Sequence, residues 1–205
     1  MNKIGTTEWD NVDIINALDK FLELYKTRPI TTNTGGGLSV NLFDAYFVMN
    51  QIKPKYIIES GVFQGQGTWL IEKTLPDTSI VSIDPLPQQR IYNSPNSTYI
   101  TNDFLSFTND NISKGRASET MIYFDDHQDQ YTRLLHAHKL GFKHILLDDN
   151  HPEFRGLRHL TLAACLDNKS DDGFIIPENA ASNLRDIMDV YSVCPPIFRW
   201  VDSIT

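Results

Sequence analysis

The chain has 205 residues, of which 40% are hydrophobic and 21% charged, and its formal net charge is −8 at pH 7. This length and composition suit one core, so we expect a single domain over residues 1–205. The acidic balance argues against a protein that wraps nucleic acid, because such affinity comes mainly from lysine and arginine neutralising phosphates. We therefore expect no nucleic-acid partner.

Several motifs that the sequence lacks limit where the protein is expected to reside and what it is expected to bind. No window approaches the roughly 18 uninterrupted apolar residues of a membrane span, so we expect no membrane association. The first residues, MNKIGTTEWD, lack the apolar stretch of a secretory signal, which predicts a cytoplasmic protein. Cys165 and Cys194 match no spaced metal motif and are expected to be reduced. The sequence leaves the oligomeric state open, a homo-oligomer included.

Two helices are predicted before the first strand. Apolar residues recur at intervals of three and four over 9–26, as one face of an amphipathic helix requires. A turn-rich loop over 31–37, TTNTGGG, precedes a second helical pattern over 39–51, which Pro54 closes. We interpret 1–53 as an N-terminal helical cap and 54–205 as a Rossmann-like core.

Beyond this cap, short apolar runs alternate with longer helical patterns. The alternation predicts a mostly parallel sheet with helices on both faces, which is a Rossmann-like, doubly wound α/β fold. Only one strand is visible near the end of the chain, so the C-terminal edge of the sheet is either shortened or formed differently. The predicted strands are 56–59, 80–83, 99–101, 121–124, 144–147 and 198–204, and the predicted helices are 68–73, 130–140, 154–166 and 178–191.

The first predicted strand of the core leads into a glycine-rich turn. In the segment ESGVFQGQG, Glu59 precedes Gly61, Gly65 and Gly67, and a helical pattern follows. At the carboxyl end of a parallel strand, glycines let a ligand approach the backbone, and the helix N-terminus offers free amides. A purely structural turn is the alternative interpretation of a lone glycine pattern.

Two further acids follow the next strands. Asp84 ends the second predicted strand, where a carboxylate can accept hydrogen bonds from ribose hydroxyls, and Asp103 follows the third. The order ExGxxxGxG, with Glu59 before the first glycine, resembles class I S-adenosylmethionine (SAM)-dependent methyltransferases rather than the GxGxxG of NAD-binding folds. The resemblance implies that Glu59 and the glycines surround the methionine moiety, that Asp84 holds the ribose and that Asp103 lies near the adenine.

A second acidic cluster follows the fourth and fifth predicted strands. The fourth ends in DDHQD, with Asp126 and His127, and the fifth in DDNH, with Asp149 and Asn150. Converging carboxylates repel unless a cation offsets them, and a hard divalent ion such as Mg²⁺ accepts oxygen ligands. Helix capping is the alternative role for these acids. Neighbouring residues on a strand point oppositely, so whether Asp125 or Asp126 faces the site stays open.

These acidic pairs resemble those of known O-methyltransferase families. Catechol O-methyltransferases carry an Asp-His pair after strand four and an Asp-Asn pair after strand five, matched here by Asp126-His127 and Asp149-Asn150. Macrocin O-methyltransferase-like enzymes are similar in their acids and in their glycine turn. The resemblance covers residues 56–152 and implies a Mg²⁺ ion held by Asp126, Asp149 and Asn150. It departs at the catalytic lysine of the catechol enzymes, which is missing after His127.

We therefore predict a Mg²⁺-assisted O-methyltransferase that acts on a small hydroxylated acceptor. In this hypothesis Asp126 and His127 are catalytic: the metal lowers the pKa of an acceptor hydroxyl, and His127 or His151 accepts its proton. The loop over 28–37 and the segment after Pro152 are expected to form the acceptor pocket. The competing hypotheses are a noncatalytic ligand-binding or interaction domain and an NAD-dependent oxidoreductase.

Overall fold

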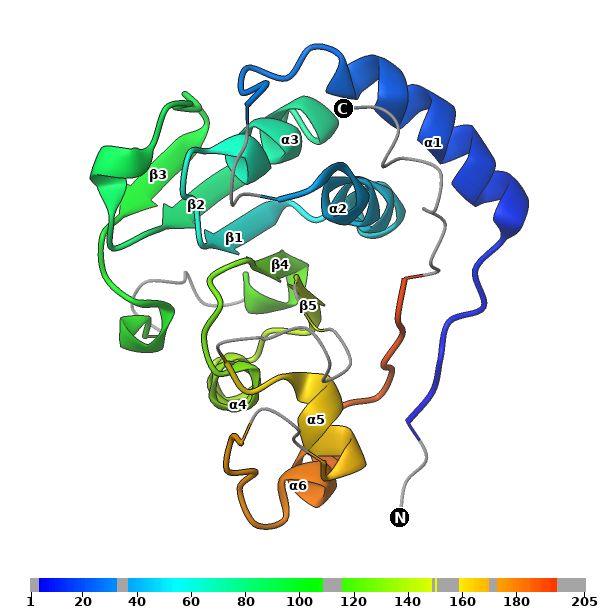
Figure 1. Ribbon diagram of the computed structural model, residues 1–205, viewed down its shortest axis with the longest axis vertical. Coiled ribbons are helices and arrows are strands. Elements are labelled where there is room, and N and C mark those ends of the chain that lie inside the picture. Colours follow the sequence, from blue (N-terminus) through cyan, green and yellow to red (C-terminus); the bar gives the residue numbers. More distant parts are fainter. Residues whose placement is uncertain are drawn as a thin grey trace.

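A five-stranded parallel sheet forms the centre of the protein (Figure 1). The computed structural model describes residues 4–32, 37–108, 116–148, 150, 159–169 and 173–194. The strand order is β3-β2-β1-β4-β5, so the order reverses between β1 and β4. The strands are β1 Tyr56–Ser60, β2 Ser79–Ile83, β3 Ser97–Ile100, β4 Thr120–Phe124 and β5 His144–Leu147. Each apolar run predicted to be a strand within the described residues therefore forms one.

All five strands end at one level of the sheet. Ser60 of β1 pairs with Ile83 of β2 and with Phe124 of β4. These two residues pair in turn with Ile100 of β3 and with Leu147 of β5. The residues that follow the five strands therefore lie along one edge, which we call the carboxyl rim.

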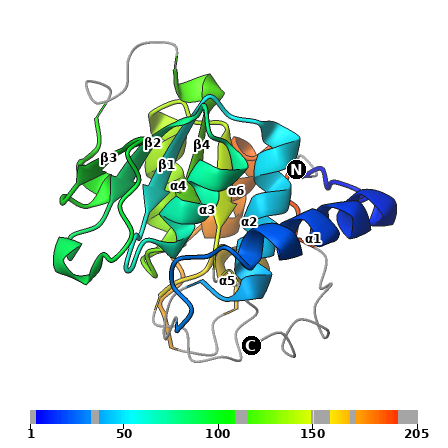
Figure 2. The same ribbon diagram turned by 90° about the horizontal axis from the view of Figure 1, so that it is seen from above.

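Helices cover both faces of the sheet, as the view from above shows (Figure 2). One face packs against α1, α2 and α3 in a single hydrophobic cluster, and the other packs against α4 and the short 3-10 helix η2. Helices α5 and α6 pack together on α4. The fold is therefore the predicted Rossmann-like, doubly wound α/β class. The helices are α1 Asn11–Tyr25, α2 Ser39–Ile52, α3 Gln66–Thr74, α4 Gln130–Lys139, α5 Leu162–Asp167 and α6 Ala180–Ile187, with 3-10 helices η1 Pro87–Gln89, η2 Phe104–Ser106 and η4 Ala117–Glu119.

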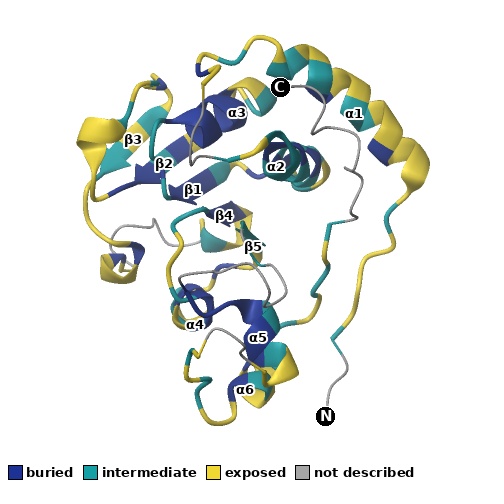
Figure 3. Ribbon diagram, in the orientation of Figure 1, coloured by how far each residue is buried: buried dark blue, intermediate teal, exposed yellow. Residues whose placement is uncertain are grey.

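The layering decides which way the polar side chains at the rim point. Strand β4, between β1 and β5, is buried along its whole length (Figure 3). Its Tyr123 packs in the cluster with α3, whereas Phe124 packs in the cluster with α4. Side chains alternate along a strand. In β1, accordingly, Glu59 bonds to α3 and Ser60 bonds on the α4 side.

Two helices near the end of the described chain differ from their predicted bounds; residues 154–158 of the helix predicted over 154–166 lie outside the described residues, and 159–161 are not helical. Helix α5 begins at Leu162, because the Thr161 hydroxyl caps its first turn. Helix α6 ends at Ile187, and the chain then extends so that Val190 forms a parallel bridge with Gly5. The predicted ends were wrong because a helical period does not reveal where capping or long-range pairing stops a helix.

The N-terminal segment lies beside the end of the described chain (Figure 1). The Gly5 amide donates to the Asp189 carbonyl at 2.9 Å, and the Trp9 indole donates to the Val193 carbonyl at 3.0 Å. The strand predicted over 198–204 lies outside the described residues, so the form of the C-terminal edge stays a prediction. Among the described helices, none is long and apolar enough to cross a membrane.

Candidate functional site

The glycine turn joins β1 to α3 on the carboxyl rim. Gly61 has a φ of 97°, and a Cβ there would lie 2.0 Å from the Asp125 carbonyl oxygen, so a glycine is needed for this close approach. A Cβ on Gly67 would lie 2.6 Å from Oε1 of Glu59. Gly65, the cap residue of α3, lies against a backbone carbonyl of the loop after β2. Protein neighbours therefore account for all three glycines, and the pattern alone does not identify a ligand.

Glu59 lies beneath the turn and is fully buried. Its Oε2 accepts hydrogen bonds from the Thr68 hydroxyl at 2.5 Å and the Ser82 hydroxyl at 2.7 Å. Burial raises the pKa of Glu59 to about 7, although these two hydrogen bonds lower it. Glu59 therefore supports the start of α3 from inside the protein and does not reach the solvent-facing surface of the rim.

Several buried polar atoms at the start of α3 lack a hydrogen-bond partner among the described residues. They are Oε1 of Glu59, Oε1 of Gln64 and both amide atoms of Gln66, whose exposed fraction is 3%. An unsatisfied buried polar group costs about 1–3 kcal/mol, so a polar ligand or an ordered water would be stabilised here. Sequence reasoning missed Gln64 and Gln66, because glutamine beside glycine is equally typical of an exposed turn.

Asp84, the residue after β2, binds the glycine turn. Its Oδ2 accepts hydrogen bonds from the backbone amides of Val62 at 2.9 Å and Phe63 at 2.7 Å. Its Oδ1 accepts a third from the Leu86 amide at 2.7 Å. The carboxylate therefore holds the turn in shape, and its contact with a ribose stays a prediction.

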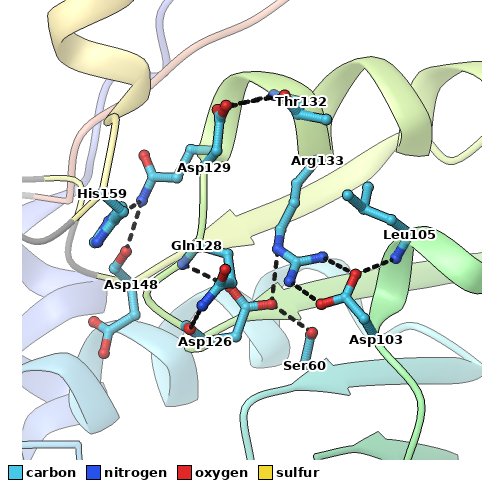
Figure 4. Close-up of polar contacts among 11 residues, drawn as sticks. Ser60, Asp103, Leu105, Asp126, Gln128, Asp129, Thr132, Arg133, Asp148 and His159 are labelled. Atoms are coloured by element: carbon cyan, nitrogen blue, oxygen red, sulfur yellow. Dashed lines mark hydrogen bonds and ion pairs between the residues drawn. The ribbon is translucent and has the colours of Figure 1, made fainter. Parts of the chain in front are cut away.

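Asp103 and Asp126 share one buried arginine (Figure 4). Nη2 of Arg133, on α4, donates to Oδ2 of Asp103 at 2.7 Å. Nε of Arg133 lies 2.9 Å from Oδ2 of Asp126, in an ion pair without hydrogen-bond alignment. The Ser60 hydroxyl donates to the same Asp126 oxygen at 2.5 Å. The loops after β3 and β4 are thereby joined to each other and to the end of β1.

The two carboxylates respond differently to this shared arginine. The side chain of Asp103 is 52% exposed; desolvation raises its pKa, but hydrogen bonds from Arg133 and the Leu105 amide outweigh it and leave the pKa lowered. The side chain of Asp126 is 12% exposed, and burial raises its pKa more than Arg133 and the Ser60 hydroxyl lower it. Asp103 is therefore the stronger ionic partner of Arg133.

The two aspartates after β4 belong to different polar groups. Asp126 faces α4, as its bonds to Ser60 and Arg133 show. Asp125 lies on the other side, where a Cβ on Gly37, just before α2, would be 3.9 Å from its Oδ2. The structure thus answers which way each of these neighbouring acids points. Asp126 contacts the arginine that also holds the acid after β3.

Asn150, a predicted metal ligand, bonds to the protein through both ends of its amide. Oδ1 accepts a hydrogen bond from a backbone amide of α5 at 3.0 Å, and Nδ2 donates to the Tyr191 hydroxyl at 2.8 Å. Asp149 lies outside the described residues. In the described ranges no group of three His, Cys, Asp or Glu side chains could hold a metal ion. Asp126, paired with Arg133, and Asn150 do not by themselves fit the Mg²⁺ site, which stays a prediction.

His127 lies in the loop after β4 and is exposed, with a φ of 53°. Its ring meets the buried His159 ring edge-on, with 5.9 Å between centroids. Nε2 of His159 lies 3.5 Å from the Gln130 amide nitrogen, which donates to the Asp148 carbonyl at 3.1 Å. Sequence reasoning missed His159, which no motif marks. His151, the other candidate base, lies outside the described residues, as does most of the expected acceptor segment after Pro152.

Fold and rim together define a Rossmann-like α/β domain whose polar groups gather at the carboxyl ends of its strands. No family model and no curated protein matches the chain. Solved structures match it partially. CmcI, solved with Mg-SAM, has a TM-score of 0.44 and 16% identity, and the match covers 62% of this chain. The chain spans less than two thirds of the length of CmcI, 65%.

Two further solved structures overlap with more of the chain. The O-methyltransferase TomG from Streptomyces achromogenes, in complex with SAM, has a TM-score of 0.48 and 15% identity, covering 87% of this chain and 82% of that chain. A Podospora anserina methyltransferase bound to SAH has a TM-score of 0.49 and 14% identity, covering 91% of this chain and 85% of that chain. At such identities the likeness concerns the fold, so function must be argued from the rim itself.

Proposed function

We propose that the chain is a SAM-dependent methyltransferase that acts on a small-molecule acceptor, most simply through an acceptor oxygen. The observation that carries the proposal is the group of unpartnered, buried polar atoms of Gln64 and Gln66 at the start of α3, just after the carboxyl end of β1. Rossmann-like folds bind nucleotides at this end of the sheet. The amino and carboxylate groups of a methionine moiety are complementary to a glutamine amide, which both donates and accepts.

The rest of the rim suits the other parts of SAM. In the proposed pose the turn at Gly61, Gly65 and Gly67 lies beside the methionine moiety. Asp84 and Asp103, after the neighbouring strands β2 and β3, lie beside the ribose and the adenine. Leu86 and Leu105 follow these acids closely and are exposed, so they offer apolar surface to an adenine ring. The residue order ExGxxxGxG favours SAM over NAD as the nucleotide.

The loop after β4 is the proposed place of chemistry. Gly61 packs against the peptide between Asp125 and Asp126, so this loop adjoins the turn. Bound SAM supplies an electrophilic methyl group on a sulfonium. The acceptor hydroxyl would lose its proton as its oxygen takes this methyl group and S-adenosylhomocysteine leaves, and exposed His127 is the proposed proton acceptor, because histidine titrates near neutral pH. Asp126, held by Ser60 and Arg133, is proposed to orient this loop.

Assistance by Mg²⁺ is the finer part of the proposal and depends on Asp149. The other two proposed ligands, Asp126 and Asn150, are engaged by Arg133 and Tyr191 respectively. An ion bound by all three would have to replace contacts that the protein already makes. We therefore assign no step of the reaction to a metal. Calorimetric titration with Mg²⁺, with and without Asp149→Asn, tests this part separately.

Isothermal titration calorimetry with S-adenosylhomocysteine (SAH), SAM and NAD tests the cofactor. Wild-type protein is expected to bind SAH and SAM but not NAD. Gln66→Leu should weaken SAH binding roughly tenfold, since an unmade hydrogen bond in a buried site costs about 1–3 kcal/mol. Gln51→Leu, an exposed glutamine on α2, is the matched control and should bind as wild type.

The alternative outcomes discriminate between the hypotheses. An absence of SAM and SAH binding at millimolar concentration would overturn the proposal, and preferential NAD binding would replace it with an oxidoreductase. Binding of SAH without methyl transfer to any of a panel of hydroxylated acceptors would leave a noncatalytic binding domain.

A further inference from the structure

We propose that Arg133 is a positioning residue: when a ligand binds beside Asp103 on the carboxyl rim, the contact between Arg133 and Asp126 changes. The inference rests on the proposed function, because it takes Asp103 to lie beside the adenine and Asp126 to lie beside the methyl group. Its basis is the single guanidinium that contacts both carboxylates (Figure 4). The two ends of the cofactor would then meet side chains that share one counterion.

Arg133 is held where it can reach both loops. It sits in the first turn of α4, which Asp129 caps by accepting hydrogen bonds from the Thr132 amide at 3.1 Å and hydroxyl at 2.9 Å. The guanidinium carbon lies 5.8 Å from the Phe104 ring centroid and 5.7 Å from that of Phe124. A buried arginine between aromatic rings has few alternative positions. A displacement of one carboxylate therefore changes the contact that the guanidinium makes with the other.

The sheet itself provides no direct link between the two acids. Strands β3 and β4 are separated by β2 and β1 in the strand order, so their loops do not meet by strand pairing. The chain after β3 instead forms η2, which packs against α4 and brings Asp103 to the arginine. Within the described residues, Arg133 forms an ion pair with the acid of each of these two loops.

The two contacts of Arg133 differ in geometry. Arg133 binds Asp103 through two nitrogens, at 2.7 and 3.4 Å, but approaches Asp126 through Nε alone and without alignment. Asp103 is half exposed and free to receive an adenine amino group, whereas Asp126 is nearly enclosed. A ligand that draws the Asp103 carboxylate toward itself loosens its hold on the guanidinium, which can then align with Asp126. By thermodynamic reciprocity, Asp126 also influences ligand binding at Asp103.

Backbone amides beside each acid report on the two ends of this link. The Leu105 amide donates to Asp103 at 2.8 Å, and the Gln128 amide donates to Asp126 at 3.2 Å. Adenosine, which lacks the methionine moiety, is the probe, because in the proposed pose it reaches Asp103 without touching the loop after β4. Amide NMR spectra of the wild-type protein are recorded while adenosine is added. Both amides are expected to shift.

Three variants locate the link. Arg133→Met should abolish the shift of Gln128 and retain that of Leu105. Asp103→Asn should do the same while leaving Arg133 and Asp126 paired, and its retained Leu105 shift shows that adenosine still binds. Asp103 is half exposed, so this second variant is expected to fold even where loss of the buried arginine prevents folding. Arg185→Met, which removes an arginine that donates to the Leu166 carbonyl in α5, is the matched control and should respond as wild type.

The possible failures are distinguishable. A Leu105 shift without a Gln128 shift in the wild-type protein would overturn the link while leaving the nucleotide site intact. A Gln128 shift that survives in Asp103→Asn would overturn the route through Arg133. No shift of either amide, together with no binding of SAH, would instead mean that the proposed function itself has failed.

Discussion

Replacement of Glu59 by glutamine is expected to stabilise the protein at neutral pH and to change little in acid. Burial raises the pKa of Glu59 to about 7, from an ordinary value of 4.5. Below 4.5 the carboxyl group is protonated in both the folded and the unfolded chain, so it costs nothing. As the pH rises from 4.5 toward 7, the unfolded chain loses the proton first, which favours unfolding. Above about 7 this cost is complete.

The size of the effect follows from the difference between the two pKa values. From 4.5 to about 7, at about 1.4 kcal/mol per pH unit, the cost to the free energy of unfolding is about 3 kcal/mol. Glutamine does not titrate, and its oxygen can still accept the hydrogen bonds from Thr68 and Ser82. The stability difference between Glu59→Gln and wild type should therefore grow from near zero in acid to about 3 kcal/mol above neutrality.

Urea unfolding of both proteins across this pH range measures the difference. Glu72→Gln is the control, because the pKa of Glu72 is lowered: desolvation raises it, but hydrogen bonds from Lys73, Ser94 and Tyr92 together outweigh this. Its contribution is therefore present above its ordinary pKa and lost as the pH falls, so the sign is opposite. Parallel stability curves for Glu59→Gln and wild type between 4.5 and 7 would refute the reasoning about the buried carboxyl group.

Two further predictions concern contacts that hold the rim together. Gly67→Ala places a methyl group 2.6 Å from Oε1 of Glu59, so thermal unfolding should show a loss of about 1–3 kcal/mol, and an unchanged stability would contradict the close approach. The loss should shrink in a Glu59→Ala background, where the obstructing carboxyl group is gone. Tyr191→Phe removes the hydroxyl that binds Asn150, so urea unfolding should report a loss of about 1 kcal/mol; a fully stable variant would mean that this bond does not hold the segment after β5.

The strands could be predicted from the sequence because each is a short apolar run between polar turns. The run predicted over 144–147 coincides with β5, and the shared level of the strand ends follows from parallel pairing. The ends of α5 and α6 could not be predicted in the same way. The cap of α5 is a local hydrogen bond from the Ala164 amide to the Thr161 hydroxyl, which the helical period does not mark, and the pairing of Val190 with Gly5 is a tertiary contact that leaves no local pattern.

The site was predictable as a set of positions but not as a set of contacts. Parallel strand ends bring Asp84, Asp103 and Asp126 to one rim, which spacing alone can indicate. What each carboxylate binds depends on partners from distant elements. Arg133 lies in the polar pattern of α4, where an arginine is usually exposed, so nothing in the sequence marked it as the buried counterion of two acids.

A crystal structure of the protein with SAH bound tests the central claim most directly. We predict ligand density along the carboxyl rim, with the amino-acid end against Gln66 and the adenine between Leu86 and Leu105. Density at another surface of the molecule, or an empty rim in a protein that binds SAH in solution, would contradict the claim.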